Sequence, residues 1–360
     1  MTSRATVLKR AAELRAAFEA AGALPVEAQI LQPADTLLDL YGEEIRARAY
    51  VTSDAMRGEQ MLRPDFTVPV VQMHMAHGAE PARYTYSGEV FRRQEQDPDR
   101  ANEYMQVGFE VFDRENPALA DAEVFALFAE AVAPLNLRAA TGDIGILMAA
   151  VKGLNTTEAR KSALLRHIWR PRRFRNLLDR YAGRIAPPKQ RVALLDGSAK
   201  PCTAPLVGRR SQAEIDARIA RLRDDAATPP LAGDEVILLD TLLNVRETMP
   251  YALEQLRDIA VDMPSISDAV TRLSARADAL SARGIVVDDL PFEASFGRTS
   301  MEYYDGFVFG FFNPDRADWP AVATGGRYDA LTKRLGGGNA IPAVGGVLRP
   351  DLVTELEAGA

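Results

Sequence analysis

Five short segments of this 360-residue chain combine carboxylates, arginines, amides and phenol hydroxyls, the side chains that bind small polar molecules. In chain order they are LRPDFT (residues 62–67), FRRQ (91–94), QVGFE (106–110), MEYY (301–304) and GGRYD (325–329). Carboxylates and amide oxygens accept hydrogen bonds from an ammonium group, and a guanidinium binds a carboxylate or a phosphate. A pocket whose buried polar groups each need a partner selects a matching ligand. These segments are therefore candidates for a binding site if the fold brings them together.

Three of the segments also have an ordinary structural interpretation. Gln106 and Glu110 alternate with apolar residues, so by themselves they indicate the solvent face of a strand. Tyr303 and Tyr304 would lie on opposite sides of a strand, and we favour Tyr304 as the one that binds a ligand. The two glycines of GGRYD are interpreted mainly as turn residues.

Composition and charge exclude several classes of function. The 47% hydrophobic and 26% charged residues are typical of a soluble globular protein, for which this length predicts two domains. A net charge of −7 gives no global positive field to attract nucleic acid or an anionic membrane. With Cys202 as the single cysteine, the chain can form neither an internal disulfide nor a cysteine-based zinc site.

No part of the chain reads as a targeting or membrane segment. The amino end runs directly into an amphipathic pattern without an apolar signal core, and no stretch approaches the ~20 apolar residues of a membrane span. We therefore expect a cytoplasmic protein with no membrane contact.

Hydrophobic periodicity predicts an α/β alternation interrupted by a long helical segment. Expected helices before the interruption are 7–21, 34–40, 68–76, 120–133 and 144–151, and expected strands are 27–33, 49–51, 61–63, 82–87, 89–92 and 107–112, with a hairpin loop at 93–106. Residues 154–283 are helical in pattern and rich in arginine, which indicates an inserted subdomain. Strands return at 284–287, 292–296 and 306–312, followed by a turn into a helix at 325–335 and a final helix at 351–357.

Taken in order, the five segments resemble the motifs of class II aminoacyl-tRNA synthetases, and among these the histidyl-tRNA synthetases. LRPDFT is similar to the family's L-R-P-E/D-x-T, FRRQ to motif 2 (F-R-x-E), QVGFE to Q-x-G-x-E, MEYY to R-G-L-D-Y-Y, and GGRYD to G-G-R-Y-D. One such motif is weak evidence, but five in family order are specific. The resemblance implies an α+β fold whose class II core (1–153 and 284–360) has a mixed, mainly antiparallel sheet flanked by helices, with an inserted helical subdomain at 154–283.

Carried over residue by residue, the resemblance implies a pocket for free histidine. Its residues would be Asp65, Thr67, Gln106, Glu110, Arg298, Tyr304 and Tyr328. The first three would hold the α-ammonium group. Glu110 and Tyr304 would bind the imidazole, with Tyr328 nearby, and Arg298 would face the carboxylate.

Departures from the synthetase pattern argue against aminoacylation. Arg92 of motif 2 is present, but its glutamate is replaced by Gln94, and Asn102 stands where a second loop arginine is expected. VGGVLRP (344–350) is shorter than motif 3 and lacks its acidic residue. The resemblance therefore implies a vestigial ATP site, with no catalytic residues, metal or cofactor. Its remaining residues are Arg92, Arg100 and Arg349.

Two further departures concern the histidine motif and tRNA. The segment RTSMEYY contains one residue more than R-G-L-D-Y-Y, so Arg298 is one position out of register. Only residues 351–360 follow motif 3, where the synthetases continue with an anticodon-binding domain. Because the chain is also acidic, we expect no tRNA binding.

A synthetase-like chain with these losses resembles the regulatory subunits of ATP phosphoribosyltransferase. The resemblance implies a short-form catalytic subunit as partner, its activation, and feedback inhibition by histidine in the first step of histidine biosynthesis. The motif 1-like strand near Gln29 implies a homodimer within a hetero-oligomer. Three alternatives stay open: a truncated ligase that adenylates histidine or another amino acid, an RNA-binding or stress-sensing module, and an assembly role without histidine binding.

Two other groups of residues receive no chemical role. An arginine cluster in the inserted segment is expected to be a solvated helix end, with a protein contact as the alternative. It comprises Arg166, Arg170, Arg172, Arg173 and Arg175. His74, His77 and His167 form no recognisable catalytic or metal-binding pattern.

Overall fold

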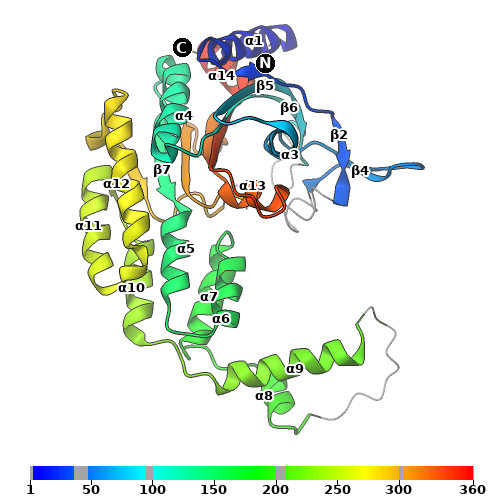
Figure 1. The fold of residues 1–360 in the computed structure, drawn as a ribbon, viewed down its shortest axis with the longest axis vertical. Helices are drawn as coiled ribbons and strands as arrows, with labels where there is room; N and C mark the ends of the chain where they lie inside the picture. The colour runs from blue at the N-terminus through cyan, green and yellow to red at the C-terminus, as the bar shows by residue number, and fades with distance from the viewer. Residues whose placement is uncertain are drawn as a thin grey trace.

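A computed structural model of the chain describes residues 3–35, 48–93, 100–199, 208, 210–299 and 303–359. Its centre is a nine-stranded sheet in the order β1-β5-β6-β12-β11-β10-β7-β9-β8. Neighbouring strands are antiparallel except for the pairs β1–β5 and β7–β9. A smaller sheet has the order β2-β4-β3. The predicted fold class, a mixed and mainly antiparallel sheet flanked by helices, is confirmed (Figure 1).

The bounds of the elements are as follows. The large sheet contains β1 (Leu24–Pro25), β5 (Ala82–Phe91), β6 (Glu103–Phe112), β7 (Arg138–Asp143), β8 (Arg246–Thr248), β9 (Pro291–Glu293), β10 (Phe307–Phe312), β11 (Ala323–Arg327) and β12 (Ala343–Leu348), and the small sheet contains β2 (Leu31–Pro33), β3 (Val51–Asp54) and β4 (Gly58–Leu62). The helices are α1 (Arg4–Ala20), α3 (Thr67–His77), α4 (Pro117–Val132), α5 (Ile144–Gly153), α6 (Glu158–Arg166), α7 (Pro171–Tyr181), α8 (Lys189–Leu195), α9 (Gln212–Ala227), α10 (Gly233–Leu243), α11 (Met249–Asp262), α12 (Ser267–Ala282), α13 (Asp329–Leu335) and α14 (Pro350–Gly359).

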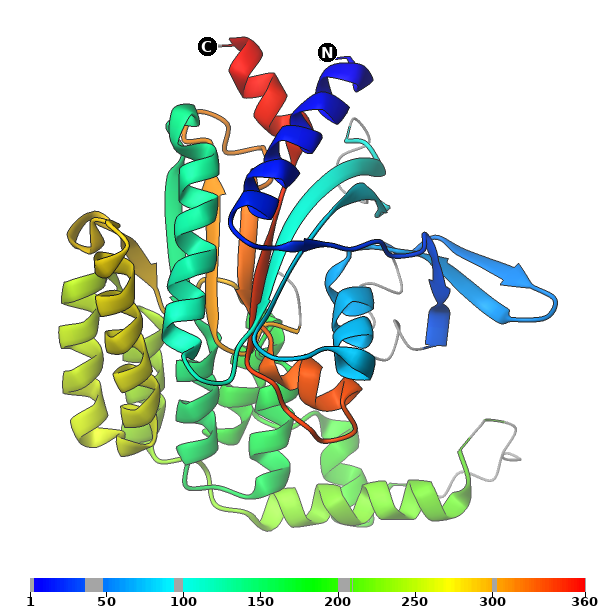
Figure 2. The ribbon, with the colours of Figure 1, turned by 45° about the horizontal axis from the view of Figure 1, so that its top comes forward.

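Aromatic side chains on one face of the large sheet pack against aromatic side chains of the covering helices. Alternate residues of a strand point to the same face, so every second residue of β10 belongs to this layer. Its three phenylalanines at 307, 309 and 311 contact Phe125 of α4. Phe18 of α1 contacts Phe109 of β6. Helices α1 and α14 pack side by side at the chain ends (Figure 2).

The opposite face of the sheet is partly covered by α3 and α13, which contact each other. His74 of α3 stacks on Phe112 of β6, with 3.9 Å between the ring centroids. Several positions on this face are glycine, including Gly108 of β6 and Gly345 of β12. The face therefore has room for polar side chains, and the predicted site residues lie on it.

The inserted segment divides into two structurally different parts. Helices α10 to α12 pack beside the core, where α12 contacts α4, and β8 forms the edge of the large sheet by pairing with β9. Helices α8 and α9 extend away from the sheet and contain no buried residue in the described chain (Figure 1). The subdomain boundaries at 154 and 283 stay a prediction.

Several predicted elements are corrected. The strand expected at 27–33 is limited to Leu31–Pro33, and 284–287 contains no strand but leads into a 3-10 turn at Val287–Asp289. The helix expected at 34–40 lies mostly outside the described residues, as do Gln94 and Cys202.

The glycines at 325 and 326 are not turn residues, because they lie within β11. A Cβ atom on Gly325 would lie 2.3 Å from the ring of Phe309, and one on Gly326 would lie 2.7 Å from the ring of Tyr304. These positions need glycine for close packing on both faces of the sheet.

Candidate functional site

A buried carboxylate, Glu110, lies at the centre of the polar face of the sheet. Its Oε1 accepts hydrogen bonds from the hydroxyls of Thr67 (2.9 Å) and Tyr86 (2.8 Å), and its Oε2 accepts one from Tyr328 (2.6 Å). Only 1% of Glu110 is exposed. We call Thr67, Tyr86, Glu110 and Tyr328 the Glu110 cluster. It joins three of the predicted motifs around a carboxylate that has three hydroxyl donors.

Burial in these surroundings raises the pKa of Glu110 to about 7, because desolvation penalises the charged form and the carboxylate of Asp65 adds repulsion. The three hydroxyl donors oppose the shift by stabilising the charged form. Glu110 therefore changes its charge near neutral pH.

Two glycines make room for the Glu110 cluster. Gly345 pairs with Glu110 across the sheet, and a Cβ atom there would lie 1.4 Å from Oε2 of Glu110. Gly108, the central residue of QVGFE, faces Tyr86 on β5, and its Cβ would lie 2.2 Å from the tyrosine ring. These two positions cannot carry a side chain while the cluster keeps this arrangement.

A cavity of about 40 Å³ adjoins the cluster. Its polar lining includes Asp65, Thr67 and Gln106, together with Tyr303, Tyr304 and Arg92. Tyr303 donates to Oδ2 of Asp65 at 3.4 Å, and Arg92 Nη2 lies 3.8 Å from the same atom. The Oε1 atom of Gln106 is buried and has no partner among the described residues. The cavity thus contains a carboxylate and an unused hydrogen-bond acceptor.

The structure brings together six of the seven predicted histidine-binding residues. Asp65, Thr67, Gln106 and Tyr304 line the cavity, and Glu110 and Tyr328 lie in the adjoining cluster. Tyr303 lines the cavity as well, so the expectation that one of the two neighbouring tyrosines packs elsewhere is wrong. The described chain forms a turn here and not a strand, which allows both rings to reach the cavity.

Arg298 is the predicted site residue that lies elsewhere. Its Nε donates to the carbonyl of Ile168 at 2.8 Å, and its guanidinium lies over the ring of Phe174, 4.7 Å from the centroid. It lines a different cavity, beside α7. Gly297 has φ +87°, a conformation that turns the chain just before Arg298. The extra residue noted in this motif therefore coincides with a position of Arg298 beside α7 and away from the cavity next to Glu110.

The three residues predicted as a vestigial ATP site line two cavities that share one residue. Arg92 and Arg349 line the cavity beside Glu110. Arg100 and Arg349 line a neighbouring cavity of about 280 Å³, to which Arg316 and Tyr104 also contribute. The guanidinium of Arg349 lies 4.5 Å from the centroid of the Tyr104 ring.

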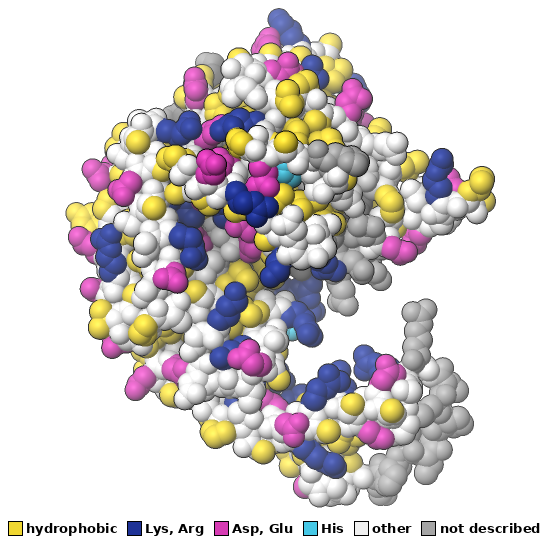
Figure 3. Space-filling view, viewed as in Figure 1, with side chains coloured by type: hydrophobic (Ala, Val, Ile, Leu, Met, Phe, Trp, Pro, Cys, Tyr) yellow, Lys and Arg dark blue, Asp and Glu magenta, His cyan; other side chains and the backbone are white. Residues whose placement is uncertain are grey.

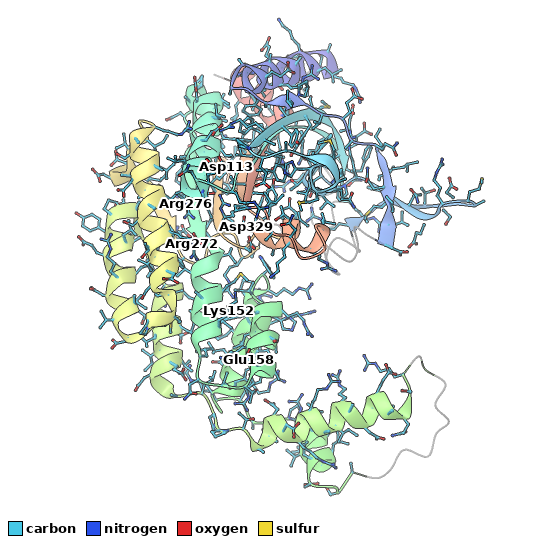
Figure 4. All side chains as sticks on the ribbon, viewed as in Figure 1. Asp113, Lys152, Glu158, Arg272, Arg276 and Asp329 are labelled. Carbon is cyan, nitrogen blue, oxygen red and sulfur yellow. The ribbon has the colours of Figure 1, made fainter. Side chains whose placement is uncertain are left out.

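A second group of charges, buried apart from the partly exposed Asp329, connects the inserted segment to the core. Asp121 of α4 accepts from Arg276 of α12 at 2.8 Å and from Arg327 of β11 at 2.7 Å. Arg276 also pairs with Asp143 at 2.9 Å, and Arg327 with Asp329 at 2.9 Å. Figure 4 labels Arg276 on α12 and Asp329 at the start of α13. We call these five residues the Asp121 cluster.

Sequence reasoning missed several of these residues. Tyr86 and Gly345 belong to no predicted role, although Gly345 lies in the motif 3-like segment. The Asp121 cluster was also missed, because its ion pairs span as many as 206 residues. That Tyr86 faces Gly108 follows from the pairing of β5 with β6, which local sequence patterns do not show.

The described residues offer neither a metal site nor a membrane-spanning helix. No group of three or more His, Cys, Asp or Glu side chains there is placed to hold a metal ion. No helix in the same part of the chain is both long and apolar enough to cross a membrane.

Comparison with known proteins defines the class to which this fold and site belong. The sequence profile of the family described as "Histidyl-tRNA synthetase" matches residues 3–199 and 207–353. A histidyl-tRNA synthetase from Nostoc sp. PCC 7120 has the same fold, with a TM-score of 0.65 and 16% identity over 98% of this chain and 72% of its own. The chain is thus built on a class II synthetase-like domain.

More similar relatives identify the family. The ATP phosphoribosyltransferase regulatory subunits of Brucella anthropi and Brucella abortus are each 33% identical over 355 residues, covering 92% of this chain and 93% and 92% of their own lengths. The chain belongs to the family of ATP phosphoribosyltransferase regulatory subunits. A structure from Bacillus halodurans, described as an ATP phosphoribosyltransferase regulatory subunit/histidyl-tRNA synthetase, shares the fold with a TM-score of 0.69 and 21% identity over 98% of this chain and 79% of that one.

Proposed function

We propose that this protein binds a short-form ATP phosphoribosyltransferase, activates it, and transmits feedback inhibition by histidine through the cavity beside Glu110. The observation that carries the proposal is the Glu110 cluster: a buried carboxylate with a pKa near neutrality beside a cavity lined by Asp65 and Gln106. The relatives' name supplies the partner. The chain itself is proposed to perform no catalysis.

The chemistry of the cavity suits the three polar parts of histidine. Asp65, Thr67 and Gln106 offer acceptors for the ammonium group. The pKa of an ordinary imidazole, about 6.5, is close to the pKa of Glu110, about 7. A proton can therefore be shared between the two groups near neutral pH. Arg92 and Arg349 line the cavity and are the cations proposed for the carboxylate, in place of Arg298.

Histidine binding is proposed to be coupled to a movement of side chains. The cavity of about 40 Å³ is small for an amino acid, so side chains that line it would move to admit one. A ligand that fits only a rearranged pocket binds one conformation better than another, which is the requirement for shifting a population. By reciprocal linkage, a catalytic subunit that prefers the other conformation would then bind or work less well in the presence of histidine.

The proposed assembly is a homodimer of this chain within a hetero-oligomer, without tRNA. Its test adds the purified protein to the short-form ATP phosphoribosyltransferase of the same organism and follows phosphoribosyl-ATP formation with and without histidine. Activation that histidine reverses is the expected result. Absence of both a complex and activation would contradict the regulatory proposal.

A variant locates the histidine site. Glu110→Ala removes the acceptor of three hydroxyls and is expected to weaken histidine binding by ~1–3 kcal/mol, the usual cost of leaving buried polar groups without partners. Isothermal titration of histidine into the complex with the catalytic subunit measures this loss of affinity. Unchanged affinity would place the histidine site elsewhere.

A truncated ligase is the second candidate, and one observation favours it. Arg92 and Arg349 line the same cavity as Asp65, and Arg100 lines the adjoining one, an arrangement with cations for phosphate groups. A histidine-dependent pyrophosphate exchange assay separates the two functions. Turnover would support the ligase, and its absence together with activation of the partner would support the regulator.

A further inference from the structure

A buried arginine beside α7 lacks a carboxylate partner. Arg298 is 5% exposed, and among the described residues its guanidinium forms no salt bridge within 4.0 Å. Its Nε donates to the Ile168 carbonyl, but its Nη2 is buried without any acceptor in the described part of the chain. Burying an unpaired charge is costly, and arginines in such positions are usually paired. Within the described part of the chain, Arg298 therefore has no anionic partner.

An open pocket of about 520 Å³ adjoins this arginine. Arg172 and Arg175 line it from α7, and Arg298 lines it from the turn after β9. Arg175 is already paired with Asp240 at 2.6 Å, which leaves Arg172 and Arg298 for a ligand. The rest of the lining is largely apolar and includes Pro171, Phe174, Leu178 and Leu243.

Two further features favour an anion at this place. The N-terminus of α7, an eleven-residue helix whose first turn lines the cavity, has neither a capping side chain nor an acidic residue in that turn. Residues 154–230 carry 17 basic and seven acidic side chains, a local charge of +10 in a protein of net charge −7. Figure 3 shows basic side chains gathered along the hollow between the core and the α8–α9 pair. This local field attracts anions.

We propose that the cavity between α7, α10 and the turn after β9 binds a small organic anion, with a carboxylate or phosphate held by Arg298 and Arg172 and an apolar body against Phe174 and Leu243. The guanidinium supplies charged hydrogen bonds to the anionic group. The apolar lining selects against fully hydrated inorganic ions. The site is separate from the cavity beside Glu110, and its function does not depend on histidine binding.

The probe for this site is hexanoate, with hexanol as its uncharged counterpart and sodium chloride as the ionic-strength control. Thermal unfolding of the full chain is followed as each is titrated, because a ligand that binds only the folded state raises the unfolding temperature. Hexanoate is expected to stabilise the protein more than either control. Equal effects of hexanoate and sodium chloride would overturn the proposal.

Matched variants assign the effect to the cavity. Arg298→Met is expected to weaken hexanoate binding at least about tenfold, the usual contribution of a charged hydrogen bond. Because a buried substitution can impair folding, the exposed Arg172→Glu gives an independent test on a residue that lines the cavity. Arg173→Glu makes the same charge change one residue further along α7, outside the lining, and is expected to bind hexanoate nearly normally. Equal losses in the variants at 172 and 173 would show a general charge effect and reject the site.

Discussion

The Glu110 cluster is buried, as is the Asp121 cluster apart from the partly exposed Asp329, but the two compensate their carboxylates in opposite ways. Asp121 lies between two arginines whose pKa values are raised by the surrounding carboxylates although burial acts to lower them. Glu110 has hydroxyl donors and no arginine within its cluster, and burial raises its pKa to about 7. One cluster is a closed set of ion pairs between elements, whereas the other adjoins a cavity. The first arrangement is that of a structural ion-pair network, and the second is the one for which we propose ligand binding.

The largest expected effect is on stability, from breaking the Asp121 cluster. Asp121→Asn leaves the buried guanidiniums of Arg276 and Arg327 facing a neutral amide, which is expected to cost about 3–5 kcal/mol of unfolding free energy. Urea unfolding measures this loss. The control Glu293→Gln breaks the partly exposed pair with Arg246, for which about 1 kcal/mol or less is expected. Similar losses in both variants would remove the distinction between buried and exposed pairs.

The next effect is a pH dependence that belongs to the Glu110 cluster. The folded state raises the pKa of Glu110 from 4.5 to about 7, so it binds the proton more tightly than the unfolded chain. Its contribution to stability is therefore full below pH 4.5 and falls as the pH rises through about 7, by ~3 kcal/mol in total.

Glu110→Gln isolates this contribution. Asp305 also has a pKa raised to about 7, by burial and by Asp329, so the wild type alone does not separate the two groups. The stability of wild type and variant is measured by urea unfolding at pH 5 and at pH 8. Because both proteins contain Asp305, its contribution cancels when the two changes in stability are compared. The variant is expected to lose less stability than the wild type over this interval. Equal losses would mean that Glu110 ionises normally.

A steric test follows from the close approach of β12 to Glu110. Gly345→Ala places a methyl carbon 1.4 Å from the present position of Oε2 of Glu110. The clash is expected to cost about 1–3 kcal/mol of stability and to weaken histidine binding. Gly233→Ala, whose Cβ would meet nothing within 4 Å, is the matched control. Calorimetric titration with histidine and urea unfolding give the two readouts. Normal histidine binding by the Gly345 variant would separate the cluster from the ligand.

The smallest effect distinguishes two tyrosines at the site. Tyr328→Phe removes a 2.6 Å hydrogen bond to Glu110 and is expected to cost about 1 kcal/mol, whereas Tyr303→Phe removes a 3.4 Å contact to Asp65 and should cost less. Stability and histidine affinity are measured for both variants. A larger loss for Tyr303→Phe would place the important hydroxyl on the Asp65 side of the cavity.

How far the site could be predicted depends on whether a residue's place follows from local pattern. The motifs identified Asp65, Thr67, Gln106, Glu110, Tyr304 and Tyr328, and the structure places these residues around one cavity and its adjoining cluster. Arg298 was assigned to the same place from its motif, but the turn at Gly297 directs it to α7. Tyr86 had no motif and was found only through strand pairing.

The sequence by itself determined the fold class, the order of the motifs and the residue types available for a polar pocket, because these depend on local periodicity and short patterns. Tertiary structure decided which side chains meet. Tyr328 and Glu110 are 218 residues apart, and their contact depends on the register of β6, β12 and β11. A shift of one residue in any of these strands would move its side chains to the opposite face of the sheet.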